Sequence, residues 1–386
     1  MREQEESKDL LYAIRALEIM MSSGIGLEAA ILSIAGGGYG IISEDFQKMI
    51  KGNLDGGFFV VYVGQSELNE SSFFKAKNKA IIKFNAINKM AEKYPDKIVI
   101  VKNPEEVYQA KKNNKLFAAI GIENGFIIGE NLELLEYFYS LGARYMTLSH
   151  IGHNQISDSS IPKKSLKNDN EMYGGLSKFG EKVILKMNEI GMMIDISHIS
   201  DKSALQAIEL SDSPVIASHS GVRSIADHPR NIPDNIIKKI AEKGGVIQVV
   251  AFSSYVKVNQ ERSNAMKNLR DKVIKITGDN FFIAEKHLKL TEYNKGMEQI
   301  NKKFPMPDID SFIDHIDYIV NLVGIDYVGI SSDFGGGGGI RGWSDASQTN
   351  NITSALIRRG YSDKDIQKIW AENFLRVWQE VSEGSL

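Results

Sequence analysis

The chain has 386 residues, of which 42% are hydrophobic and 25% are charged, and its formal net charge is −3. This is the composition of a globular protein, and 46 basic against 49 acidic residues give no basic patch for nucleic acid. Because there are no cysteines, disulfides, cysteine-ligated zinc and cysteine nucleophiles are excluded. The start, Met1–Glu6, is acidic where a signal peptide would be basic, and the apolar stretch Ile25–Ile34 is too short to span a bilayer. We therefore expect a cytoplasmic protein that binds neither nucleic acid nor membrane.

Short apolar runs rich in β-branched and aromatic residues recur along the chain and predict strands. In chain order they are a weak candidate, Ala30–Ile34, then Phe58–Val63, Phe117–Ile122, Tyr145–Ser149, Met192–Ser197, Val215–Ser218, Val246–Phe252 and Tyr327–Ser332. Helical patterns lie between them, at Phe74–Glu92, Asn131–Leu141, Leu176–Ile190, Lys202–Leu210 and Asp234–Glu242. Several of these helices end in glycine and lead directly into a strand, as in βα units with a parallel sheet. Eight such strands predict an α/β fold, a TIM-like (β/α)8 barrel of the metal-dependent hydrolase type.

Two connections between the predicted strands are long. Ile151–Tyr173 follows the fourth strand, and the charged segment Lys257–Lys303 follows the seventh. Connections of this length are usually lids, binding loops or insertions. We predict a single barrel domain over residues 1–386, with an atypical N-terminal segment, 1–44, and a charged insertion, 256–303.

Polar residues follow five of the predicted strands directly: Glu123, His150, His198, His219 and Asp333. The carboxyl ends of barrel strands meet at one mouth, where active sites are built. One histidine or carboxylate in such a place is more often a hydrogen-bonded turn residue than a ligand, but five at equivalent positions favour a metal site. Imidazoles and carboxylates are ligands of zinc. The remaining histidines lack this placement; a structural role is expected for His228, His287 and His315, and His153 stays open.

At this point the chain resembles the renal (membrane) dipeptidase family, whose motifs it carries in the same order. The matching segments are Arg144–His150 (RYMTLSH) with Asn154 and Asp158, Gly175–Gly180 (GLSKFG), Met187–Gly191 (MNEIG), Ile194–His198 (IDISH), Pro214–Ser220 (PVIASHS), His228–Asp234 (HPRNIPD) and Gly329–Phe334 (GISSDF). The resemblance extends from about Asp45 to near the C-terminus. The chain is thereby identified as a member of this family of zinc dipeptidases, which implies a TIM-like barrel of the amidohydrolase type.

The resemblance implies a role for each matching residue. Glu123 would bridge two zinc ions, with His198 and His219 completing the ligands of the second. His150 and Asp333 would be catalytic and would also contact the substrate, His150 beside the attacked carbonyl and Asp333 near the amine. Arg230, with Tyr255 as a weaker candidate, would bind the free carboxylate of a dipeptide, as a guanidinium fork does well.

One part of the family pattern is missing. The first zinc site of the family needs a His-x-Asp pair at the end of strand one, but the first histidine in this chain is His150. Ile31–Gly40 reads ILSIAGGGYG, with neither histidine nor carboxylate. One zinc site is therefore supported, while the second keeps only Glu123. Loss of a metal, a non-catalytic homologue and an error of reading frame in this part of the gene stay open. A smaller departure is Gly335, where the family has an aspartate.

The leading hypothesis is a zinc-dependent dipeptidase that hydrolyses small dipeptides by a metal-activated water. The alternative is an inactive homologue that binds peptides, which the missing pair favours. A deaminase or lactonase on a related barrel is less favoured, because a His-x-His on strand one is absent and Arg230 would have no purpose. The expected partner is a small dipeptide, and a homodimer stays open.

Overall fold

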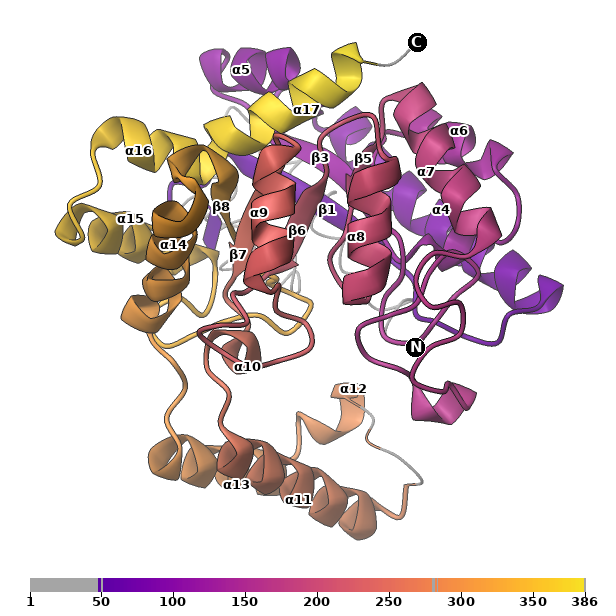
Figure 1. Ribbon diagram of the computed structural model, residues 1–386. Helices are drawn as coiled ribbons and strands as arrows, with labels where there is room; N and C mark the ends of the chain where they lie inside the picture. The colour runs from indigo at the N-terminus through magenta and orange to yellow at the C-terminus, as the bar shows by residue number, and fades with distance from the viewer. Residues whose placement is uncertain (1–47, 50, 280–281, 283, 385–386) are drawn as a thin grey trace.

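The strands form one curled, all-parallel sheet in a computed structural model that describes residues 48–49, 51–279, 282 and 284–384 (Figure 1). Hydrogen-bonded neighbours follow in the order β1 (Gly56–Tyr62), β3 (Leu116–Glu123), β4 (Ala143–Thr147), β5 (Met193–Asp195), β6 (Ile216–Ser220), β7 (Val246–Val250) and β8 (Val328–Ser331). A short strand, β2 (Ile98–Ile100), pairs with the beginning of β3 outside this path. The curled parallel sheet confirms the predicted α/β, TIM-like barrel class.

Helices connect the strands and cover the outside of the sheet (Figure 1). They are α4 (Glu70–Lys93), α5 (Pro104–Lys112), α6 (Glu133–Ser140), α7 (Lys178–Ile190), α8 (Asp201–Leu210), α9 (Asp234–Glu242), α10 (Ser253–Val256) and α14 (Ile309–Val323), followed after β8 by α15 (Thr349–Arg358), α16 (Asp363–Gln367) and α17 (Asn373–Glu383). Short turns of other helix types lie at Gly125–Ile128, Lys164–Leu166, Ile325–Tyr327, Ala346–Gln348 and Lys368–Glu372.

Helix α7 illustrates why these segments fold as they do. Ser177 caps its start by accepting a hydrogen bond from the backbone N–H of Gly180, and Gly191 ends it in the left-handed conformation, with φ of 72°. Val183, Ile184 and Met187 lie on one face of the helix and are buried against the barrel. The helix therefore begins, ends and packs where local sequence directs it.

The predicted strands from Phe58 onwards and the five predicted helices lie at, or within a few residues of, their expected places. Ala30–Ile34 lies outside the described residues. Elements without a prediction include β2 and α5, since a strand of 3 residues and a helix of 9 carry little periodic signal. The helices α10, α14, α15, α16 and α17 also had no prediction.

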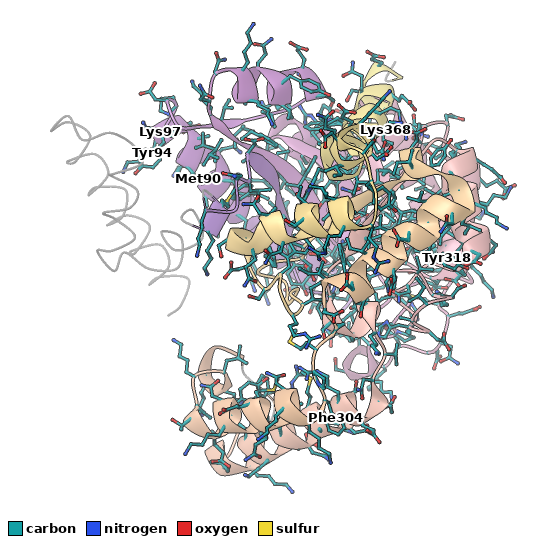
Figure 2. All side chains as sticks on the ribbon, turned by 90° about the vertical axis from the view of Figure 1, so that its left-hand side faces the viewer. Met90, Tyr94, Lys97, Phe304, Tyr318 and Lys368 are labelled. Atoms are coloured by element: carbon teal, nitrogen blue, oxygen red, sulfur yellow. The ribbon has the colours of Figure 1, made fainter. Side chains whose placement is uncertain are left out.

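The charged segment after β7 is mostly helical, so treating it as a long loop was wrong. It contains α11 (Gln260–Thr277), α12 (Ala284–His287) and α13 (Thr291–Lys303). We call residues 260–304 the helical arm. It projects from the barrel in Figure 1, and Figure 2 places Phe304 in it, apart from the main body. Its small apolar core is separate from that of the barrel and centres on Leu269, Val273, Tyr293 and Ile300.

None of the helices that the structure describes is both long enough and apolar enough to cross a bilayer.

Candidate metal and substrate site

Three of the predicted residues bring their ligand atoms together at the carboxyl ends of the strands. Glu123 is the last residue of β3, His198 lies three residues beyond β5, and His219 lies within β6. Their ligand atoms all lie within 4.8 Å of one another. Oε1 of Glu123 lies 3.2 Å from Nε2 of His198 and 3.4 Å from Nε2 of His219, and the two Nε2 atoms are 2.8 Å apart.

These distances suit a metal ion. Zinc bound at about 2.0–2.2 Å in tetrahedral geometry holds adjacent ligand atoms about 3.3–3.6 Å apart. The Glu123–His219 distance lies within this spacing and the Glu123–His198 distance is about 0.1 Å below it, whereas the distance between the two Nε2 atoms is about 0.5 Å below it. Two unprotonated Nε2 atoms this close would repel each other, so a proton or a cation must lie among these lone pairs. The residues present therefore fit a zinc ion.

A chain of hydrogen bonds fixes the protonation of His219. The hydroxyl of Ser218 donates to Oδ2 of Asp195 at 2.6 Å, because a carboxylate can only accept. The same hydroxyl lies 2.7 Å from Nδ1 of His219, so it must accept the proton of that nitrogen. The proton of His219 is thus on Nδ1, and Nε2 presents its lone pair to the cluster. This is the arrangement that supports a metal-ligating histidine.

The electrostatics of the cluster favour an ionised carboxylate and neutral imidazoles. Burial raises the pKa of Glu123, but the adjacent imidazoles of His150, His198 and His219 outweigh it and hold that pKa well below its usual range. Burial and the nearby charge of Arg230 lower the pKa of His198 well below its usual value. An anionic carboxylate with neutral imidazoles is the state in which these groups bind metal.

His150 and Asp333 border the cluster, as expected of their positions after β4 and β8. Nε2 of His150 lies 3.4 Å from Oε1 of Glu123, and its ring lies 4.1 Å from the ring of His198. Asp333 is half-buried; burial raises its pKa, and His219 and Glu123 are near enough for their charges to act on it. The next residue but one, Gly335, has φ of 83°, a conformation that favours glycine over the aspartate of the family.

Arg230 lies beside the cluster, with only 3% of its surface exposed. It donates from Nη2 to the backbone oxygen of His219 at 3.0 Å, and its guanidinium lies 5.3 Å from the ring centre of Tyr255. The ring of His228 packs against the ring of Tyr255, with the ring centres 4.7 Å apart. Nδ1 of His228 accepts the backbone N–H of Arg230 at 3.1 Å, so this histidine supports the arginine. The structure thus brings both predicted carboxylate-binding residues to the cluster of Glu123, His198 and His219.

The other histidines have protein partners that account for them. Nδ1 of His153 accepts the N–H of Ser159, and Nδ1 of His315 accepts the N–H of Val222. His287 contacts Asp279 within the helical arm. These contacts give each of the three histidines a structural role, as predicted for His287 and His315.

Sequence reasoning assigned no role to two residues that shape the site. Asp195 belongs to the motif IDISH. Its role could not be predicted from the sequence, because its hydrogen bonds to Thr147 and Ser218 depend on which strands are neighbours. Tyr62 ends β1, and its ring lies 4.8 Å from that of His150. The strand-end rule that selected His150 could have found Tyr62, had aromatic residues been considered.

A parallel barrel with a carboxylate and imidazoles clustered at its mouth defines a metal-dependent hydrolase of the TIM-like class. The chain belongs to the membrane dipeptidase family, peptidase family M19, whose model matches residues 37–385.

Individual relatives agree with this assignment. The chain is 32% identical to the probable dipeptidase PvdM from Pseudomonas aeruginosa, with a TM-score of 0.77 over 88% of this chain and 89% of that one. It is 25% identical to Dipeptidase tcpJ from Claviceps purpurea (strain 20.1), over 88% of this chain and 69% of the relative. A metallo peptidase from Rhodobacter sphaeroides, liganded with a phosphinate mimic of the dipeptide L-Ala-D-Ala, shares the fold at 19% identity and a TM-score of 0.67, covering 87% of this chain and 90% of that one.

Proposed function

We propose that this protein is a zinc-dependent dipeptidase that hydrolyses the peptide bond of small dipeptides. The observation that carries the proposal is the cluster of Glu123, His198 and His219, which offers a zinc ion three ligands and leaves a fourth position open, as in catalytic sites. When bound, zinc supplies Lewis acidity, which lowers the pKa of a coordinated water and polarises a carbonyl group.

The chain's own residues would hold a dipeptide by both charged ends. Arg230 is a buried cation next to the cluster and would bind the free carboxylate. Asp333 would face the free amine, since its carboxylate is close enough to the cluster for the charges of His219 and Glu123 to act on it. Holding the two ends at a fixed separation would favour dipeptides over longer peptides.

Two further residues would serve the reaction itself. His150, whose Nε2 is directed at the Glu123 carboxylate, would donate a hydrogen bond to the carbonyl oxygen as negative charge develops there. Asp333, whose pKa is raised by burial, would accept a proton from the attacking water and pass it to the leaving amine. The relatives support this activity, since one is a dipeptidase and another was solved with a dipeptide mimic.

A second candidate is a homologue that binds peptides without turnover. It is favoured by one observation, the absence of any histidine before His150, which removes the His-x-Asp pair of the family. Without that pair only one of the family's two zinc positions keeps recognisable ligands.

The test is hydrolysis of free-acid dipeptides by the zinc-loaded protein, compared with their C-terminal amides. We expect hydrolysis of the free acids and poor rates on the amides. Arg230→Ala should raise KM by about ten- to hundredfold, the value of a charge-assisted hydrogen-bond pair. Arg341→Ala is the control, because Arg341 is an exposed arginine whose side chain pairs with Asp308. Equal rates on acids and amides would contradict the carboxylate-binding role, and dipeptide binding without hydrolysis would favour the second candidate.

A further inference from the structure

A small pocket lies directly behind the cluster. Its volume is about 20 Å³, and His198, Ser220, Arg230 and Asn231 are among the residues that line it. A polar pocket of this size is large enough to hold one water molecule.

Three of the lining residues each carry a buried polar atom that has no hydrogen-bond partner among the residues the structure describes. The atoms are Nδ1 of His198, Nε of Arg230 and Oδ1 of Asn231. Each unpaired buried group costs about 1–3 kcal/mol, so three such groups on residues that line one pocket call for a shared partner. The arginine Nε can only donate, and the asparagine oxygen can only accept.

The orientation of Asn231 is fixed by its other contacts. Its Nδ2 donates to the backbone oxygens of Ala226 and Tyr255, both at 2.8 Å. Because both donors are used, the remaining atom must be the acceptor, Oδ1. A Cβ atom at position 221 would come within 2.5 Å of this oxygen, so the amide needs the glycine at Gly221.

The two imidazoles of the cluster differ in what supports them. Nδ1 of His219 is held by Ser218 and through it by Asp195. When Nε2 of His198 binds a metal, its proton is on Nδ1, and that N–H needs an acceptor, as metal-ligating histidines generally have. Within the described chain no side chain or backbone oxygen supplies one.

We propose that one buried water accepts hydrogen bonds from Nδ1 of His198 and Nε of Arg230 and donates one to Oδ1 of Asn231. Asn231 is then a positioning residue that acts through this water on a zinc ligand and on the carboxylate-binding arginine together. Its second contact, to the backbone of Tyr255, extends the same support to the aromatic neighbour of Arg230. The proposal rests on the proposed function, because it requires His198 to bind zinc through Nε2.

The direct test is a crystal structure of the zinc-loaded protein at about 1.5 Å resolution. We expect one ordered water within hydrogen-bond distance, about 2.7–3.2 Å, of all three atoms. A pocket without ordered water, or a protein atom bonded to Nδ1 of His198, would overturn the proposal.

Solution experiments separate this proposal from the function it rests on. Ala204 lines the pocket and Ala207, on the same helix and also buried, is not among its lining residues, so Ala204→Val would displace the water while Ala207→Val is the matched control. Chelator competition should show zinc bound about tenfold more weakly by Ala204→Val and by Asn231→Leu, as for other supporting partners of metal ligands. Thermal denaturation checks that each variant is folded. Equal zinc affinity in Ala204→Val and Ala207→Val would overturn the water bridge, whereas a parent protein that binds no zinc would overturn the proposed function instead.

Discussion

Asp195 shows how much of the site depends on a residue that contacts neither metal nor substrate. Its Oδ1 accepts the backbone N–H groups of Ser197 and Ser218, at 3.0 and 2.9 Å. Its Oδ2 accepts the hydroxyls of Thr147 and Ser218. One buried carboxylate thereby joins the ends of β4, β5 and β6, the strands that carry or precede His150, His198 and His219. A buried carboxylate that accepts this many hydrogen bonds holds its neighbours in fixed orientations.

A prediction at the level of single residues concerns His228. Burial, assisted by the charges of Arg230 and Arg223, lowers the pKa of His228 from 6.5 to about 4. The unfolded chain takes up this proton at higher pH than the folded protein does, so the free energy of unfolding decreases as the pH falls from about 6.5 to about 4. In His228→Asn this contribution is absent, so the free energy of unfolding should decrease less between pH 7 and pH 4.5 than it does in the parent protein.

Urea denaturation of both proteins at the two pH values measures the difference. Asparagine keeps an acceptor for the backbone N–H of Arg230, and the carboxylates that titrate in this range are common to both proteins. An identical pH dependence in parent and variant would show that His228 does not titrate with a lowered pKa.

At the level of elements, the strand ends were the most informative feature of the sequence. Apolar runs located the strands, and the rule that parallel strands have their carboxyl ends on the same side of the barrel selected Glu123, His198 and His219. This rule holds because all strands of a parallel barrel run in the same direction. The short strand β2 and the fold of the helical arm could not be predicted in the same way, since a strand of 3 residues has no measurable period and the helices of the arm pack mainly on each other.

The helical arm leads to a prediction about how the molecule unfolds. Its core, with Leu269 at 8% exposure, is separate from that of the barrel. Leu269→Ala should destabilise the arm by about 2–5 kcal/mol, the usual cost of such a truncation in a core. Because few apolar contacts join the arm to the barrel, hydrogen exchange should increase in α11 and α13 and stay unchanged in the barrel strands.

Hydrogen exchange followed by mass spectrometry distinguishes the two regions. Ile276→Ala is the control, since Ile276 lies on the same helix with 59% of its surface exposed. An equal loss of protection in the barrel strands of Leu269→Ala would mean that arm and barrel unfold as one unit.

At the level of the whole molecule, the barrel brings together residues from distant parts of the chain, and only some of this could be predicted. The motif resemblance and strand ends together indicated which residues gather at the mouth. They could not indicate that Ser218 determines the proton position on His219, or that Asn231 supports Tyr255, because such contacts depend on side-chain orientation. The segment in which the resemblance places the family's first metal ligands falls outside the described residues.

The last prediction concerns the number of metal ions in the whole protein. Among the residues that the structure describes, one group of three ligands is suitably placed, formed by Glu123, His198 and His219. A second zinc ion would share only Glu123, and a single carboxylate is too little to hold zinc, which binds proteins through three or four ligands. Elemental analysis after dialysis should therefore find about one zinc per chain, and His198→Ala should lose it, because removing one of three ligands leaves too few. His315→Gln serves as the control, since His315 is a buried histidine with backbone partners away from the cluster. Two zinc ions per chain with full dipeptidase activity would contradict this, and would mean that ligands other than a His-x-Asp pair complete the second position.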